Sequence, residues 1–205
     1  MTAKKPLFVT GIGTGIGKTI VSAILVEKLK ADYWKPIQSG DLDKSDSLSV
    51  QNLMSNTVTK IHPESYRLTQ PFSPHKSAAI DGVTIDPDII RLPKTDNALI
   101  VEGAGGLMVP LNNEFLIIDL IKKLDIEVIL VSQNYLGSIN HTLLSIHALK
   151  NYSIPIRGII FNGNEDISSK DFILKNSGLK LLGHIPEYNL VDKKAIIDAG
   201  NYIDL

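Results

Sequence analysis

A glycine-rich segment near the N-terminus carries the strongest chemical signal in the sequence. Residues 11–19 read Gly-Ile-Gly-Thr-Gly-Ile-Gly-Lys-Thr and follow a short apolar run. Glycines let successive backbone N–H groups turn toward an anion without a Cβ in the way. A helix that begins at Lys18 would add unpaired N–H donors and the positive end of its dipole. With the Lys18 ammonium and the Thr19 hydroxyl, the segment is predicted to bind a nucleotide phosphate chain and its Mg²⁺.

This segment departs by one residue from the usual phosphate-loop (P-loop) pattern. That pattern places a glycine five residues before Gly17, where this chain has Ile12, and the nearest glycine is Gly11. The alternative is a glycine-rich turn with a coincidental Gly-Lys-Thr. A strand before the loop and a helix after it favour the phosphate site.

Three charged residues stand where strands or turns would end. Lys35 opens the run Lys-Pro-Ile-Gln-Ser-Gly, Asp46 lies in Ser-Asp-Ser, and Glu102 follows an apolar run and precedes Gly-Ala-Gly-Gly. Because the carboxyl ends of strands form the ligand crevice of an α/β sheet, Glu102 lies near the phosphate loop if the two strands are close. Each residue has a structural alternative. Lys35 could be a solvated lysine, Asp46 a helix cap, and Glu102 a surface acid.

Short apolar runs alternate with helical periodicity along the chain, which predicts the fold. We expect strands at residues 7–10, 33–37, 98–101, 128–131, 156–161 and 181–182, and helices at 18–30, from 45 or 46, and at 117–124, 139–149 and 193–199. Residues 56–87, rich in proline, serine and threonine, are predicted to be mostly loop. Apolar strands between helices indicate an α/β fold, doubly wound, with a mostly parallel sheet flanked by helices on both faces. Residues 1–205 are predicted to form one domain.

Composition excludes several other classes of function. The chain has a net charge of −1 and no run of five or more like charges, which argues against nucleic acid or a membrane surface as partner. No cysteine is present, so disulfides and cysteine metal sites are excluded. No signal-peptide core and no apolar run of about 20 residues is present. We therefore expect a soluble, cytoplasmic protein.

Several motifs recur in one order along the chain. They are residues 11–19, Lys-Pro-Ile-Gln-Ser-Gly at 35–40, Ser45-Asp46, Ser73-Pro74-His75, Val-Glu-Gly-Ala-Gly-Gly at 101–106, Leu-Gly-Ser-Ile-Asn-His at 136–141, Asn162, and Gly-His-Ile-Pro at 183–186. In this order and spacing the chain resembles the dethiobiotin synthetase family over nearly its whole length. The resemblance implies the same fold and an enzyme that uses ATP and Mg²⁺. It also implies a homodimer with its active site at the subunit interface.

The resemblance implies specific site residues. The implied catalytic residues are Lys35, Lys18 and Thr14, and the implied metal ligands are Thr19, Asp46 and Glu102. The implied substrate residues are Ser39, beside the reacting amines, and Gly137, Ser138, Ile139 and Asn140, which reach the carboxylate from the neighbouring chain. The implied ATP-binding residues are Gly13, Gly15, Ile16, Gly17, Lys18, Thr19, Ile20, Asp46, Glu102, Gly103, Ala104, Gly105, Asn162, Gly163, Pro186, Glu187 and Tyr188.

The implied reaction joins 7,8-diaminononanoate, CO₂ and ATP into dethiobiotin, ADP and phosphate, in biotin biosynthesis. It passes through a carbamate and a carbamic–phosphoric anhydride. The chain departs from some family members at Gly15, where they carry an acid, and the family varies where this chain has Glu187 and Tyr188. Asn140 could also be an ordinary residue at a helix N-terminus.

Two other kinds of P-loop protein are alternatives. Synthetases that amidate cobyrinic acids share the nucleotide half but carry a glutamine-hydrolysing domain, and this chain has no cysteine to serve as its nucleophile. Partition-type ATPases, which act as nucleotide-driven switches, carry a second lysine near the start of the loop. Residues 12–16 contain no lysine.

Overall fold

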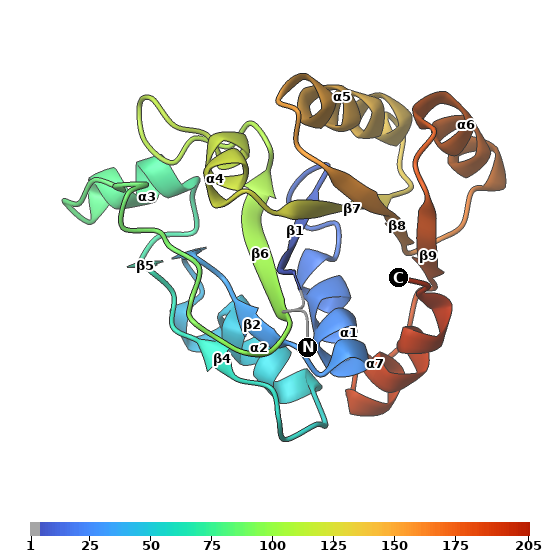
Figure 1. The fold of residues 1–205 in the computed structure, drawn as a ribbon, viewed down its shortest axis with the longest axis horizontal. Helices are drawn as coiled ribbons and strands as arrows, with labels where there is room; N and C mark the ends of the chain where they lie inside the picture. The colour runs from blue at the N-terminus through green and yellow to red at the C-terminus, as the bar shows by residue number, and fades with distance from the viewer. Residues whose placement is uncertain (1–4) are drawn as a thin grey trace.

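A parallel sheet forms the centre of the fold. The computed structural model describes residues 5–205. The sheet has seven strands in the order β4-β2-β6-β1-β7-β8-β9, and every neighbouring pair is parallel (Figure 1). The strands are β1 (Leu7–Gly11), β2 (Asp32–Trp34), β4 (Ile61–His62), β6 (Leu99–Gly106), β7 (Glu127–Gln133), β8 (Ile156–Asn162) and β9 (Leu181–Ile185). The order reverses at β1, so the carboxyl ends of β1 and β6 lie together at a position typical of ligand sites.

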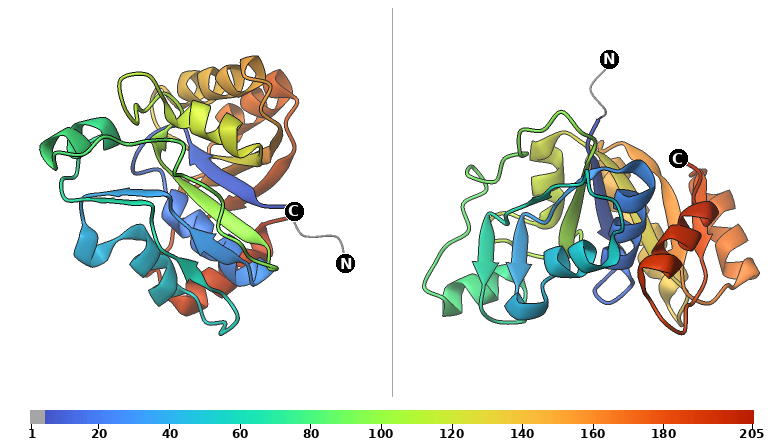
Figure 2. Two further views of the ribbon diagram at one scale, coloured as in Figure 1. Left: turned by 60° about the vertical axis from the view of Figure 1, so that its left-hand side comes forward. Right: turned by 90° about the horizontal axis from the view of Figure 1, so that it is seen from below.

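Helices cover both faces of this sheet. They are α1 (Lys18–Leu29), α2 (Asp46–Leu53), α3 (Pro74–Ile80), α4 (Ile117–Leu124), α5 (Ser138–Asn151), α6 (Ile167–Ser177) and α7 (Lys193–Ala199), with short 3₁₀ turns at Leu42–Lys44 and Gly200–Tyr202. Helices α1, α2 and α7 lie on one side, and α4, α5 and α6 on the other (Figures 1 and 2).

Alternation along the strands builds a core on each side. Val9 packs in the cluster that contains α1, while its neighbour Phe8 packs in the cluster that contains α4. Successive strand side chains point to opposite faces, so a strand buried on both sides is apolar throughout. The predicted doubly wound α/β fold is confirmed.

The prediction of one strand over residues 33–37 was wrong. The strand ends at Trp34, and residues Ile37–Ser39 form β3, which pairs with β5 (Tyr66–Leu68) in a separate two-stranded sheet. Pro36 explains the break, because proline has no N–H for the ladder and restricts the residue before it. The interruption places Lys35 between the two sheets.

The prediction that residues 56–87 are mostly loop was also incomplete. This stretch contains β4, β5 and α3, and the strands have only two or three residues, too few for periodicity to be recognised. Helix α6 was not predicted at all. It is mostly exposed, and its clearest sequence signals lie at its two ends. The Asp166 carboxylate accepts from the Ser169 N–H at the N-cap, and Gly178 adopts the left-handed conformation at the C-cap.

The described part of the chain contains no helix that is both long and apolar enough to cross a lipid bilayer.

Candidate active site

The phosphate loop connects β1 to α1 and has the backbone conformation that glycine permits. Gly15 and Gly17 have positive φ values of 75° and 89°. A Cβ on Gly17 would come within 2.1 Å of Nδ2 of Asn162, whereas at Gly13 and Gly15 it would meet nothing within 4 Å. Gly17 is therefore favoured by its left-handed backbone and by the Asn162 side chain above it, while the loop in front of Gly13 and Gly15 is open to a ligand.

Helix α1 begins at the loop with Lys18. No side chain caps its N-terminus, so the first N–H groups are available to an anion. The Lys18 side chain folds back over the loop, and its ammonium donates to the Gly13 carbonyl at 2.8 Å. Burial lowers the pKa of Lys18 to about 8, although Glu102 partly offsets this.

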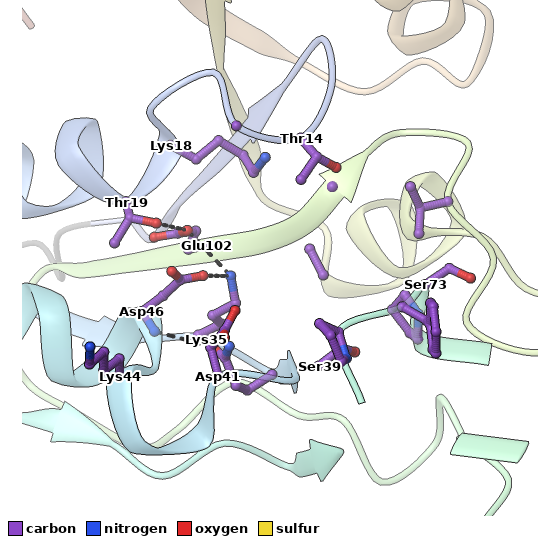
Figure 3. A pocket seen from close by; sticks show the side chains of 18 of the residues that line it. Thr14, Lys18, Thr19, Lys35, Ser39, Asp41, Lys44, Asp46, Ser73 and Glu102 are labelled. Atoms are coloured by element: carbon purple, nitrogen blue, oxygen red, sulfur yellow. Dashed lines mark hydrogen bonds and ion pairs between the residues drawn. The ribbon is translucent and has the colours of Figure 1, made fainter. Parts of the chain in front are cut away.

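A cluster of charged side chains lies opposite the loop. Glu102 on β6 accepts through Oε1 from the Thr19 hydroxyl at 2.9 Å and from the Lys35 ammonium at 3.3 Å. Lys35 also forms an ion pair with Asp46, at the start of α2. The four side chains point toward one another, and Lys18 lies across the cavity from them (Figure 3). A buried hydroxyl, that of Tyr33, donates to Glu102 Oε2 at 2.9 Å.

The charges in this cluster support one another. Burial opposes the charge on Lys35, yet Glu102 and Asp46 outweigh it and raise the lysine's pKa. Burial also opposes the charge on Asp46, and Lys35 outweighs it and lowers the pKa of that carboxyl. At neutral pH Lys35 and Asp46 therefore form a charged pair, which is mostly buried.

The oxygen atoms of this cluster fit a hard divalent cation. Thr19, Asp46 and Glu102 supply one hydroxyl and two carboxylates, the donor types that Mg²⁺ prefers. In residues 5–205 no group of three or more His, Cys, Asp or Glu side chains could hold a metal by itself. Phosphate oxygens of a nucleotide would have to complete the coordination, as is usual for Mg²⁺ in phosphoryl transfer.

The loop and the cluster border one cavity of about 750 Å³. Predicted residues that line it are Thr14, Gly15, Gly17, Lys18, Thr19, Lys35, Ser39, Asp46, Glu102, Ala104 and Gly105. Sequence reasoning missed other lining residues, among them Gln38, Asp41, Lys44 and Phe72. Gln38 had a usable signal, since it lies in the 35–40 motif. Its amide donates to the Gly40 carbonyl at 2.9 Å and accepts from the Asp46 N–H at 3.3 Å, which ties the turn to α2.

A second cavity of about 220 Å³ lies at the carboxyl ends of β8 and β9. The predicted residues that line it are Ile20, Asn162, Gly163, Pro186, Glu187 and Tyr188. The Asn162 amide also donates to the Ile16 carbonyl at 3.1 Å, which links this cavity to the phosphate loop. Ile16 itself is buried in the core, and a Cβ on Gly103 would come within 2.7 Å of Phe8, so only the backbone of either residue is available to a ligand.

The predicted residues 137–140 lie elsewhere. They line a third cavity of about 730 Å³ together with Leu136, Asp166 and others, and none of its lining residues borders the large cavity. Leu136 is fully exposed, and Tyr135 and Leu144 are also exposed. Within one chain, the structure does not bring residues 137–140 to the phosphate loop.

Comparison with solved structures shows that the fold is shared with two ATPases. The chain is similar to the cell division ATPase MinD of Pyrococcus furiosus, with a TM-score of 0.64, 15% sequence identity and 98% of each chain covered. It is also similar to a ParA family ATPase from Chlorobium tepidum, with a TM-score of 0.57 and 16% identity over 98% of this chain and 99% of that one.

Comparison with curated proteins is more specific. A family model described as an AAA domain matches residues 5–195. The ATP-dependent dethiobiotin synthetase BioD of Christiangramia forsetii is 52% identical over 94% of this chain and 92% of its own length. That of Cytophaga hutchinsonii is 48% identical over 94% of this chain and 93% of its own. The phosphate loop and the charged cluster border one cavity, and the relatives cover nearly the whole chain. The chain therefore belongs to the ATP-dependent dethiobiotin synthetase family.

Proposed function

We propose that this protein closes the ureido ring of dethiobiotin from 7,8-diaminononanoate, CO₂ and ATP, in biotin biosynthesis. The observation that carries the proposal is the placement of Lys35 between Asp46 and Glu102, in the cavity that the phosphate loop borders. Such a site would hold cations beside a nucleotide, and the proposed reaction needs no covalent nucleophile from the protein. It suits a reaction in which positioning and charge neutralisation do most of the catalysis.

The reaction follows three bond-forming steps. One amine of the substrate attacks CO₂ and loses a proton, which gives a carbamate. A carbamate oxygen attacks the γ-phosphorus of ATP and ADP leaves, which gives a carbamic–phosphoric anhydride. The second amine attacks the carbamoyl carbon and loses a proton, the bond to phosphate breaks, and the cyclic urea and phosphate are released. The chain's own residues need only hold the reactants in line and balance the developing charge.

We assign roles to several of the groups that border the cavity. Lys18 and the N–H groups of the loop bind the β- and γ-phosphates. Lys35 faces the carbamate and the transferred phosphoryl group, and Ser39 and Thr14 lie beside the reacting amines. Thr19, Asp46 and Glu102 hold Mg²⁺, which neutralises charge on the phosphates when it is bound.

The other two cavities complete the proposal. Asn162 and residues 186–188 bind the adenine in the second cavity. Residues 137–140 of one protomer bind the carboxylate of a substrate whose amines lie in the other protomer's large cavity. Since these residues do not border the large cavity of their own chain, the proposal includes a homodimer in which residues 1–205 of each chain act as one domain.

One assay separates this function from a nucleotide switch. ADP release is measured with Mg–ATP alone, with the diamine, with bicarbonate, and with both, while dethiobiotin is quantified by mass spectrometry. We expect rapid ADP release only with both, in a one-to-one ratio to dethiobiotin. ATP hydrolysis that is equally fast without the diamine would contradict the proposal and favour the switch activity of the structural relatives.

A further inference from the structure

Tyr33 is the one neighbour of Glu102 in the charged cluster that the proposed function leaves without a role. It lies on β2, in register with Ile100 on β6, and Glu102 is two residues further along β6. Residues two apart in a strand share a face, and the diagonal distance between neighbouring strands is within reach of a tyrosine. The register therefore aims the Tyr33 ring at the carboxylate on the α1 side of the sheet, where Thr19 also lies.

The hydrogen bonds divide the two oxygens of Glu102 between different partners. Oε1 accepts from Thr19 and Lys35 at the cavity, while Oε2 accepts from the Tyr33 hydroxyl at 2.9 Å. Among residues 5–205 no other group donates to Oε2. Since the glutamate is 1% exposed, water has little access to replace that donor.

Tyr33 is itself held firmly. Its side chain is fully buried in the core cluster that contains α1 and β1. With its ring fixed in the core, the Tyr33 hydroxyl is held where it donates to Glu102. A fixed donor on one oxygen sets the rotation of the whole carboxyl group, and hence the direction of the other oxygen.

We propose that Tyr33 is a positioning residue, whose hydroxyl holds Glu102 Oε2 so that Oε1 faces Thr19 and the metal–nucleotide complex. The inference rests on the proposed function, in which Glu102 contributes to binding Mg²⁺. Groups that orient a metal ligand from behind commonly change metal affinity by about 10- to 100-fold when removed.

The test is the Tyr33→Phe variant, which removes the hydroxyl and keeps the ring. Binding of a nonhydrolysable ATP analogue is measured by calorimetry, once with Mg²⁺ and once with EDTA. We expect the affinity with Mg²⁺ to fall about tenfold and the affinity in EDTA to stay nearly unchanged. Equal losses in both conditions, or no loss in either, would overturn the positioning role, because a merely structural tyrosine predicts no metal-specific effect.

Two controls make the outcome specific. Tyr66→Phe removes another tyrosine hydroxyl, one that accepts from the Asp86 N–H and does not border the cavity, and it should leave both affinities unchanged. In a Glu102→Ala background the Tyr33→Phe effect should vanish, because no carboxylate remains to be positioned. An undiminished effect there would show that the hydroxyl acts on something else.

A third measurement covers partial loss of folding and separates the two proposals. The Mg²⁺ concentration that gives half-maximal activity is independent of how much of the variant is folded, and it should rise about tenfold in Tyr33→Phe. If the wild type bound the analogue equally well with and without Mg²⁺, the metal site of the proposed function would fail, and the positioning role with it. A metal-dependent wild type with an unaltered variant would overturn the positioning role alone.

Discussion

The two places where this chain meets its proposed substrate differ in how complete they are. In the charged cluster at the phosphate loop, Lys35, Glu102 and Thr19 all have partners within the chain, and the groups are mostly buried. At the start of α5, by contrast, Gly137 has φ of 101°, no side chain caps the helix, and Leu136 beside it is fully exposed.

In the proposed homodimer, this difference would divide the work between one chain and the assembly. Groups that stabilise a transition state must be held in place before the substrate arrives, and the cluster meets that condition within a single chain. A helix start with uncapped N–H groups can bind a carboxylate, but an apolar side chain at full exposure beside it is unusual for a finished site. The comparison predicts that substitutions in the cluster have large effects on turnover. Substitutions at residues 136–140 are predicted to act through assembly of the dimer.

The largest effect is expected from Lys18→Ala. The change removes the cation that lies over the loop, 2.8 Å from the Gly13 carbonyl in the free protein. Loss of one preorganised charge of this kind lowers turnover on the order of 10²–10³-fold. The measurement is steady-state ADP release with saturating diamine and bicarbonate.

Lys180→Ala provides the control, because that lysine forms an exposed ion pair with Asp204 and does not border the cavity. Its turnover should match the wild type. Undiminished ATP turnover in Lys18→Ala would contradict the phosphate-loop assignment. It would also contradict the proposal that catalysis takes place at the phosphate loop and the charged cluster.

Lys35→Ala should come next, with a different kinetic signature. Turnover is expected to fall about 100-fold, whereas affinity for ATP changes little, because in the proposed mechanism Lys35 acts on charge that develops in the transition state on the carbamate and the transferred phosphoryl group. The variant also leaves Asp46 and Glu102 facing each other without their shared cation. Two like charges at close range repel, so the unliganded protein should lose stability, and added Mg²⁺ should restore part of it.

The measurement is kcat and KM for ATP, with thermal unfolding recorded at several Mg²⁺ concentrations. Equal losses in turnover and ATP affinity would count against a role for Lys35 in the transition state. Lys123→Ala is a matched change, since Lys123 pairs with the exposed Asp88 outside the cavity. Surface ion pairs contribute little, so that variant should be close to neutral.

Much of the cluster was predictable because its residues are adjacent to strong local signals. The loop is bounded by a strand and a helix, and Glu102 directly follows an apolar run, so each could be placed after a strand. Whether the two strands are neighbours stayed open in the sequence, and the structure shows that β1 and β6 pair, with Glu102 inside β6. The break at Pro36 was not recognised, and it is this break that positions Lys35 between Asp46 and Glu102. A proline inside an apparent strand is a signal that could have been used.

Other parts were not accessible to pattern reasoning. Strands β4 and β5 are too short to show a period, and Tyr33 looked like any core aromatic residue. Its contact with Glu102 depends on the register between β2 and β6, which is a tertiary property. Register is set by pairing in the folded sheet, so the residue pattern within one strand does not reveal it.

A smaller effect is expected from Leu136→Asp, which tests the other side of the comparison. If residues 136–140 face a second copy of the chain, a carboxylate there would be buried against apolar surface, and dimerisation should weaken at least about tenfold. Sedimentation velocity measures the dimer. The KM for the diamine should rise with it, whereas affinity for an ATP analogue should not change, because the loop belongs to a single chain.

Val58→Asp makes the same substitution at another exposed apolar residue and should leave both assembly and kinetics unchanged. A Leu136→Asp variant that assembles and reacts like the wild type would show that this surface is not the interface. The two halves of the site would then have to meet in some way other than the proposed homodimer.

The smallest effect concerns pH and returns to Lys18. Its pKa of about 8 in the free protein means that the side chain is mostly charged at pH 7 and mostly neutral at pH 9. A bound phosphate favours the charged form and raises the pKa again, so ADP binding above pH 8 requires uptake of a proton. Affinity for ADP, measured by calorimetry in EDTA, should therefore fall about tenfold between pH 7 and pH 9.

Stability of the unliganded protein should change in the opposite direction. The folded state holds the Lys18 proton less tightly than the unfolded state does, so between pH 8 and 10.5 unfolding takes up protons and this residue's contribution to stability increases with pH. Lys18→Arg separates this titration from others, since a guanidinium stays charged throughout the range. Its ADP affinity, whatever the value at pH 7, should be nearly flat to pH 9. A slope equal to that of the wild type would assign the titration to another group. The charge on Lys18 would then not account for the pH dependence of ADP affinity.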